Sequence, residues 1–199
     1  MRKRTVLTTS AFAILVALST WVGCAASGGT RPDKTPEENE QVAVITTEKG
    51  KIVVALYPDA APVTVDNFQK LIKKKFYDGL TFHRRVNSQN LNIIQGGDPK
   101  EDGTGGPGYT IIDEYTNPNQ VRHLRGTVAM ARPNAPDSAG SQFYVCLKAQ
   151  PHLDGGYTTF GQVIQGMDVV DQLRVDDIIQ KVRLEAKSKY VTPQEKSIQ

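Results

Sequence analysis

Three stretches carry most of the information in this 199-residue chain: Phe82-His83-Arg84, Gln95-Gly96-Gly97-Asp98 and Gly140-Ser141-Gln142-Phe143-Tyr144. They stand among short apolar runs, which are separated by Gly- and Pro-rich segments such as Gly103 to Gly108 and Pro133 to Gly140. Many short strands joined by turns of this kind are typical of an antiparallel barrel or sandwich. The sequence therefore predicts a mainly β domain.

The spacing of apolar residues predicts the individual elements. Proline suits the first turn of a helix, and apolar residues recur at helical spacing after Pro62, so a helix is expected from there to about Gly79. The lysines within 70–75 lie mostly off its apolar stripe, which indicates a solvated face. A second short helix is expected at 167–173. Strand-like runs occupy 42–45, 51–56, 93–94, 109–112, 126–131, 142–147, 158–163 and 178–184, with the first two joined as a hairpin.

The first 23 residues have the layout of a secretory signal peptide, with a positive start, an apolar core and small residues at the end. The apolar core is short for a membrane span, which needs about 20 residues, and a membrane helix is the alternative. Val22-Gly23-Cys24 resembles the end of a bacterial lipobox, whose cysteine is lipidated, although Trp21 stands where Leu is usual. Ordinary cleavage nearby is the other possibility. We expect an extracytoplasmic, lipid-anchored protein, on the periplasmic side in a cell with two membranes.

The rest of the chain divides by composition. Residues 24–41 contain no large apolar side chain and are expected to form a flexible tether. A folded domain at 42–190 and a polar tail at 191–199 follow. Of the 24 basic residues, three lie in the first 23 positions, which leaves 21 against 21 acidic residues in the mature chain. This balance argues against a nucleic-acid partner.

Several familiar motifs fail on inspection. The segment Gly103 to Gly108 fits G-x-G-x-x-G, but no strand precedes it and no helix follows, so a dinucleotide site is not expected. The three histidines form no metal-binding pair, and Cys146 sits in an apolar run as a small core residue. No metal and no cofactor are expected.

Taken in order, the motifs closely resemble the cyclophilin family of peptidyl-prolyl cis/trans isomerases over about 42–182. They are Pro62-x-Thr64-x-Asp66-Asn67-Phe68, F-H-R, Q-G-G-D, G-T-G-G, M-A-R, G-S-Q-F and L-D-G. The resemblance implies a closed eight-stranded antiparallel β-barrel capped by two α-helices. Its active site would be a shallow groove on the outer face of the barrel.

The reaction that this resemblance implies needs little chemistry from the protein. Resonance holds an X–Pro bond planar behind a barrier of about 18–20 kcal/mol. At the twisted transition state the amide nitrogen regains its lone pair, and a fixed cationic donor favours that state over the planar one. By resemblance Arg84 is this donor, and Gln95 holds its guanidinium and contacts substrate. The remaining substrate-binding candidates are Phe82, Ile93, Ala131, Arg132, Gln142, Tyr144, His152, Leu153 and Tyr157.

These candidates have different expected roles. Ile93, Tyr144 and Leu153 map to the proline pocket, although ordinary core packing is the alternative for them. Arg132 replaces an asparagine that acts mainly through its backbone, so this change is expected to matter little. His152 and Tyr157 stand where vertebrate cytosolic cyclophilins carry a tryptophan and a histidine, which implies weak cyclosporin affinity.

The spacing between Arg84 and Gln95 departs from the family. Ten residues separate them, where the family usually has seven. By counting, Asn92 takes the place of a pocket aromatic, though Leu91 could swing into the space. We expect a polar, mobile loop at 85–94 that weakens the pocket, and shortening it should raise peptide turnover.

The resulting hypothesis is a monomeric prolyl isomerase, held at a membrane by its lipid, that acts on proline-containing unfolded or exported polypeptides. The alternative is a cyclophilin-fold peptide-binding module or chaperone with little turnover, which the longer loop would favour.

Overall fold

The computed structural model describes residues 41–190. The predicted signal peptide at 1–23, the lipidation site at Cys24, the tether up to residue 40 and the polar tail at 191–199 lie outside the described residues. Within 41–190, no helix is long and apolar enough to cross a membrane.

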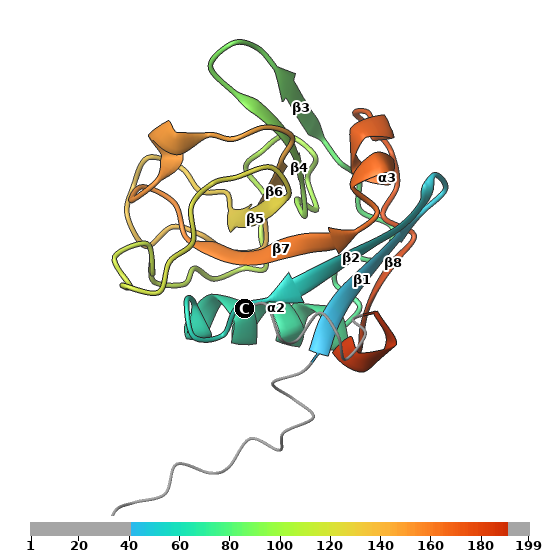
Figure 1. Ribbon diagram of the computed structural model, residues 1–199, viewed down its shortest axis with the longest axis horizontal. Coiled ribbons are helices and arrows are strands. Elements are labelled where there is room, and N and C mark those ends of the chain that lie inside the picture. Colours follow the sequence, from blue (N-terminus) through green and yellow to red (C-terminus); the bar gives the residue numbers. More distant parts are fainter. Residues whose placement is uncertain (1–40, 191–199) are drawn as a thin grey trace, which may run out of the picture. The chain divides into compact units, whose positions relative to one another are not determined.

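An eight-stranded antiparallel sheet forms the body of the domain (Figure 1). Its strands are β1 Gln41–Thr47, β2 Gly50–Leu56, β3 Arg84–Asn87, β4 Asn92–Gly96, β5 Thr127–Met130, β6 Phe143–Cys146, β7 Thr159–Gln165 and β8 Lys181–Ala186. Their order across the sheet is β3-β4-β6-β5-β7-β2-β1-β8. The predicted mainly β fold with eight antiparallel strands and two helices is confirmed.

The two edge strands of this sheet, β3 and β8, do not pair with each other in the described range. A bridge between Thr81 and Ile178 lies next to them, and the Phe82 amide donates to the carbonyl of Asp177 over 2.9 Å. These contacts, and not a continuous ladder, link the segments that precede β3 and β8.

The first helix, α2 Pro62–Lys73, begins at a proline as predicted. The amides of its first turn have no partners within the helix. Glu114, from a distant loop, accepts hydrogen bonds from the amides of Val63 and Thr64 at 3.0 and 2.8 Å. A carboxylate also complements the positive end of the helix dipole. A long-range contact therefore supplies the helix cap, and no local sequence signal reveals it.

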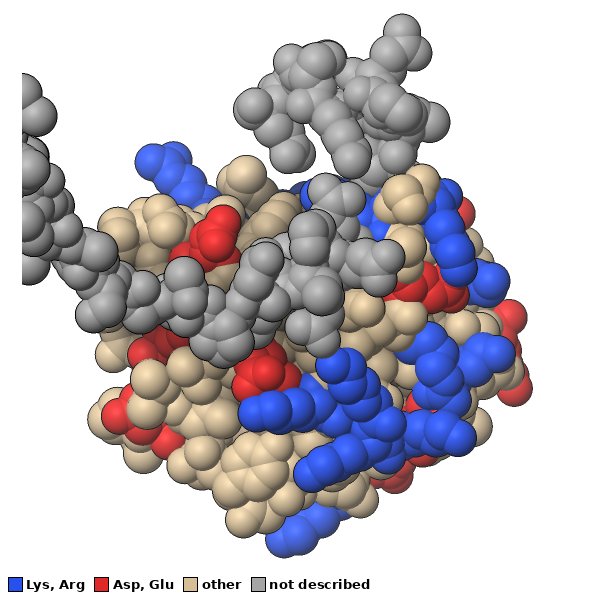
Figure 2. Space-filling view, turned by 90° about the horizontal axis from the view of Figure 1, so that it is seen from below, with Lys and Arg blue, Asp and Glu red and all other residues tan. Residues whose placement is uncertain are grey.

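The remaining helical elements are short. They are α3 Met167–Gln172 and two 3-10 turns, η1 Pro151–Leu153 and η2 Lys187–Lys189. The lysines at 70, 73, 74 and 75 at the end of α2 are exposed, as predicted. In Figure 2, which views the molecule from below, basic side chains gather on one part of this side.

Two strand predictions and one loop prediction need correction. The run Tyr109–Ile112 forms no strand, and only Ile111 makes a bridge, to Ala139. The last strand begins at Lys181 and not at 178. The predicted mobile loop at 85–94 is instead a β-hairpin made by β3 and β4, because Arg85 to Asn87 pair with Asn92 to Ile94.

Alternation along the central strands divides the apolar residues into two clusters. Residues of one parity, such as Ile94 and Val145, join the main core with the buried stripe of α2. Residues of the other parity form a second cluster on the opposite face, made of Ile93, Ala129, Tyr144 and Cys146 with Val86, Leu91, Ala131, Leu153 and Tyr157 at its margin. This second cluster is the base of the site.

Candidate active site

Register places the principal site residues in one row across four strands. Arg84 on β3 is opposite Gln95 on β4, which is opposite Tyr144 on β6, which is opposite Ala129 on β5. Because residues opposite each other on neighbouring strands share a face of the sheet, the arginine, the amide and the aromatic ring all lie on the outer face.

This row borders a pocket of about 190 Å³. Its lining comprises Arg84, Leu91, Ile93, Gln95, Ala131, Arg132, Tyr144, Leu153 and Tyr157. Eight of the predicted site residues thus meet at one place. The rings of Tyr144 and Tyr157 pack edge to face, with centroids 6.2 Å apart, and give the pocket an aromatic corner.

A directional chain of hydrogen bonds holds Arg84. Its Nη1 donates to Gln95 Oε1 over 2.9 Å, since a guanidinium can only donate. The amide nitrogen of Gln95 therefore faces Gln142 and donates to its Oε1, also over 2.9 Å. The amide nitrogen of Gln142 in turn donates to the carbonyls of Gly103 and Gly105 at 3.0 and 2.9 Å.

The Q-G-G-D motif builds the end of this chain. Gly97 has φ +86°, and a Cβ there would lie 2.6 Å from the carbonyl oxygen of Ser141, so the tight turn after β4 requires glycine. Asp98, fully buried, then accepts the amides of Lys100 and Gly103 at 2.7 and 2.6 Å. This folded loop presents the carbonyls that orient Gln142. The loop that Gly97 and Asp98 form thus orients Gln142, which orients Gln95, which holds Arg84.

The hairpin between Arg84 and Gln95 supplies an apolar wall. Leu91 lines the pocket, while Asn92, only 4% exposed, turns back and donates from its amide to the Ser88 carbonyl. The tip is fixed, because the Ser88 amide donates to the Leu91 carbonyl and the Leu91 amide donates to Ser88 Oγ. Leu91 therefore occupies the place that counting gave to Asn92.

Arg132 does more than its predicted backbone role. Its guanidinium donates to the carbonyls of Pro133 and Gly156 at 2.9 and 2.8 Å. It also pairs with Asp113 at 3.2 Å and lies over the Tyr157 ring, 5.1 Å from its centroid. The side chain is thus engaged in holding the pocket wall and the loop beside it.

Three predicted substrate-binding residues, Phe82, His152 and Gln142, do not line the pocket. Phe82 is fully buried and packs against Phe143 in the main core, because it precedes β3 on the inner side of the sheet. His152 is exposed on η1 and does not line the pocket, whereas its neighbour Leu153 does. Gln142 lines a second hollow of about 540 Å³ next to the pocket, together with the Gly103–Gly108 loop.

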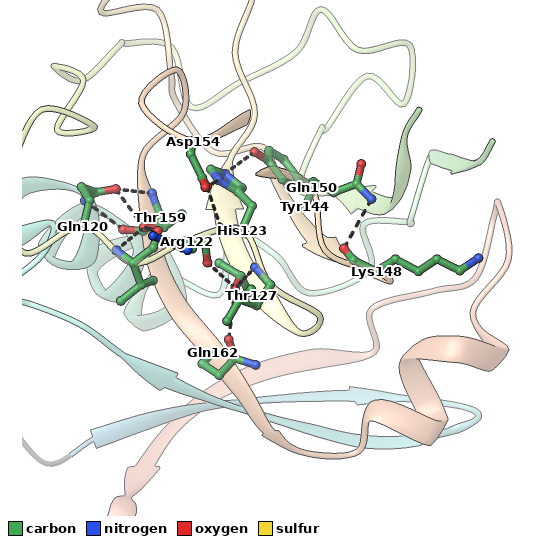
Figure 3. Close-up of polar contacts among 12 residues, drawn as sticks. Gln120, Arg122, His123, Thr127, Tyr144, Lys148, Gln150, Asp154, Thr159 and Gln162 are labelled. Carbon is green, nitrogen blue, oxygen red and sulfur yellow. Dashed lines mark hydrogen bonds and ion pairs between the residues drawn. The ribbon is translucent and has the colours of Figure 1, made fainter. Parts of the chain in front are cut away.

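Sequence reasoning missed His123 and Asp154. His123 is buried behind the pocket and contacts both the Tyr144 hydroxyl and the Asp154 carboxylate (Figure 3). The L-D-G motif contains Asp154, but nothing in the spacing pairs it with a histidine 31 positions earlier. Cys146 was assigned correctly to the apolar interior, where burial raises the pKa of its thiol to about 12.

The site thus combines an arginine, held by a hydrogen bond, with an adjacent pocket that Tyr144 and Leu153 help to line. Comparisons with known proteins identify the family of the chain. The family model for cyclophilin type peptidyl-prolyl cis-trans isomerase/CLD matches residues 42–192. Peptidyl-prolyl cis-trans isomerase B of Bacillus subtilis is 46% identical over 135 residues, covering 68% of this chain and 91% of that protein. A Synechococcus elongatus peptidyl-prolyl cis-trans isomerase is 46% identical over 144 residues, covering 71% and 94%.

Solved structures show the same relationship. A Cryptosporidium parvum cyclophilin crystallised in the presence of the dipeptide Ala-Pro is similar with a TM-score of 0.65 at 27% identity. The match covers 73% of this chain and 99% of that one. The chain belongs to the cyclophilin-type peptidyl-prolyl cis-trans isomerase family. Its activity is accordingly the isomerisation of prolyl peptide bonds.

Proposed function

We propose that Arg84 accelerates this isomerisation by stabilising the twisted X–Pro amide while the proline ring lies in the adjacent pocket. The observation that carries this proposal is the hydrogen bond from Arg84 to Gln95 at the edge of the pocket, which offers the proline ring the side chains of Ile93, Tyr144 and Leu153. Within residues 41–190, that bond uses one of the five donors of the guanidinium. The others remain for the prolyl amide.

The physical basis is differential binding. The planar amide nitrogen is a poor acceptor because its lone pair is delocalised, and it becomes a good acceptor only when the bond is twisted. A donor held in place before the reaction needs no reorganisation, and the loss of one such donor typically costs a factor of about 10²–10³ in kcat. No nucleophile and no proton transfer are required.

The substrate in this proposal is a proline-containing polypeptide in an extended, accessible conformation. The similar C. parvum cyclophilin was crystallised with Ala-Pro, which supports a proline ring in the pocket of this chain. The backbone next to the proline would lie along Ala131 and Gln142, towards the second hollow. Unfolded chains can enter such an open groove.

We further propose that the clients are exported proteins and that the enzyme is a monomer held at a membrane by a lipid on Cys24. The charged start, the apolar core and Val22-Gly23-Cys24 support this location. In the Cys24→Ser variant the protein should move from the membrane to the soluble fraction with unchanged isomerase activity. Mass spectrometry that finds an unmodified Cys24 inside a longer mature chain would refute lipidation.

The alternative, a binding module with little turnover, depended on a weakened pocket wall. Leu91 now lines that wall, which favours the enzyme. Measuring cis/trans exchange of an X–Pro peptide beside its binding affinity separates the two functions. Binding without faster exchange would select the module.

A further inference from the structure

A polar chain with the buried His123 at its centre lies directly behind the proline pocket. His123 is 1% exposed and touches Tyr144 on one side and Asp154 on the other (Figure 3). Its Nε2 is 2.9 Å from the Tyr144 hydroxyl, and its Nδ1 is 2.8 Å from Asp154 Oδ1. The ring of Tyr144 lines the pocket, so this chain connects the aromatic wall to two groups that do not line it, His123 and Asp154.

The chemistry of these groups fixes the direction of each hydrogen bond. The Asp154 carboxylate accepts, and it also receives the backbone amide of His123 over 2.8 Å, so the imidazole proton is on Nδ1. Burial lowers the pKa of His123, which keeps the ring neutral, although Asp154 opposes part of this effect. Nε2 then accepts from the Tyr144 hydroxyl, and burial raises the pKa of that phenol and keeps its proton in place.

The same histidine holds a second wall of the pocket. The backbone amide of Gln150 donates to the backbone carbonyl of His123 over 2.7 Å. The backbone amide of Leu153 in turn donates to the backbone carbonyl of Gln150 over 3.0 Å. The segment that carries Leu153 is thus attached to His123 at both ends, by Gln150 and by Asp154. Tyr144 and Leu153 come from different parts of the chain. His123 links them, because it contacts the Tyr144 hydroxyl and also both residues that hold the Leu153 segment.

We propose that His123 and Asp154 are positioning residues of the isomerase reaction, which hold Tyr144 and Leu153 at the separation that the proline ring requires. This inference rests on the proposed function, because it assumes that the ring occupies this pocket. Neither residue touches substrate. They act by orienting the ring of Tyr144 through its hydroxyl.

This role predicts a particular kinetic effect. The walls contact the proline ring in the planar and the twisted states alike, so loosening them weakens binding equally in both. Arg84 is held by a separate chain through Gln95 and keeps its position. Loss of the Tyr144 hydroxyl should therefore raise KM and leave kcat nearly unchanged, whereas loss of Arg84 should lower kcat.

The test uses the full-length chain and an X–Pro peptide, with Tyr144→Phe as the main variant. This change keeps the ring and removes only the hydroxyl. Tyr190→Phe is the matched control, because it also removes a hydroxyl hydrogen bond, to Glu185 on β8, and neither residue lines the pocket. We expect KM to rise about three- to tenfold in Tyr144→Phe with kcat within about twofold, and no change in Tyr190→Phe. An unchanged KM, or an equal loss in kcat, would overturn the proposal.

A second measurement tests the proposal directly on the structure, in case poor folding of a variant lowers its measured turnover. ¹⁵N NMR of labelled histidine should show His123 protonated on Nδ1 with Nε2 as acceptor, and the Nε2 resonance should shift in Tyr144→Phe and not in Tyr190→Phe. A proton on Nε2 would contradict the assignment. Should Tyr144→Phe fail to fold, Asp154→Asn replaces it with the same expected rise in KM. Wild-type turnover is measured first, so failure of the isomerase proposal is distinguishable from failure of this one.

Discussion

Changing Gln95 to glutamate tests whether a directional amide chain holds Arg84. The substitution replaces one NH₂ group by an oxygen. The new carboxylate could still accept from Arg84, but its second oxygen would then face Gln142 Oε1, to which the amide nitrogen of Gln95 now donates over 2.9 Å. Two acceptors would lie in contact in a place where both side chains are less than one tenth exposed.

Rotating the amide of Gln142 would not relieve this conflict. Its nitrogen would then face the new carboxylate, but its oxygen would face the carbonyls of Gly103 and Gly105, so that one unfavourable contact would be exchanged for two. A buried hydrogen-bonding group without a partner costs about 1–3 kcal/mol. In addition, a carboxylate would draw Arg84 towards itself and neutralise the charge that the twisted amide needs.

We expect Gln95→Glu to lower kcat/KM by about ten- to a hundredfold, which corresponds to roughly 1.4–2.8 kcal/mol. Its melting temperature should fall by several degrees, at about 2–4 °C per kcal/mol for a domain of this size. Gln180→Glu is the control, because that side chain is exposed on the approach to β8. If Gln95→Glu kept its melting temperature and its turnover within about twofold of wild type, the directional chain would be wrong.

Three further changes test other parts of the pocket. Leu91→Ala should raise KM about tenfold, because a partly buried leucine contributes roughly 1–2 kcal/mol to such a wall, and peptide titration checks this. Deleting 88–90 should lower turnover in the same assay, contrary to the expectation from sequence, because it removes the turn that places Leu91. The melting temperature should fall from about pH 7.5 to about pH 5.5, and less so in His123→Asn. Burial lowers the pKa of His123 below its unfolded value of about 6.5, so its contribution is present above that pH and is lost as the pH falls.

Sequence patterns predicted the elements that are held together by residues close to one another in the chain. The stripe of α2 is buried where helical spacing placed it, and the hairpin of β1 and β2 forms as the polar turn indicated. The run at 93–94 predicted part of β4, but β3 and its pairing with β4 were not predicted, because polar side chains at 87–90 are typical of a loop. What fixes this pair is the turn at Ser88 to Leu91 and the register of Arg84 opposite Gln95, neither of which the spacing of apolar residues shows.

The candidate site shows the same division. Motif resemblance grouped Arg84, Gln95 and most of the pocket lining, and the structure brings these residues together around one pocket. It misplaced Phe82, which precedes the first residue of β3 and packs in the main core instead of lining the pocket. It also missed His123, because the hydrogen-bond partners of this buried histidine, Asp154 and Tyr144, are far from it in the sequence.

Whether Arg84 stabilises the twisted amide is decided by kcat/KM for an X–Pro peptide in Arg84→Ala, measured beside Arg84→Lys. We predict a loss of at least about tenfold in Arg84→Ala, or about 1.4 kcal/mol, with an unchanged melting temperature. Lysine should rescue poorly, because a point charge cannot both meet Gln95 and face the substrate as a planar guanidinium does. Wild-type turnover in a folded Arg84→Ala variant would contradict this role for the arginine.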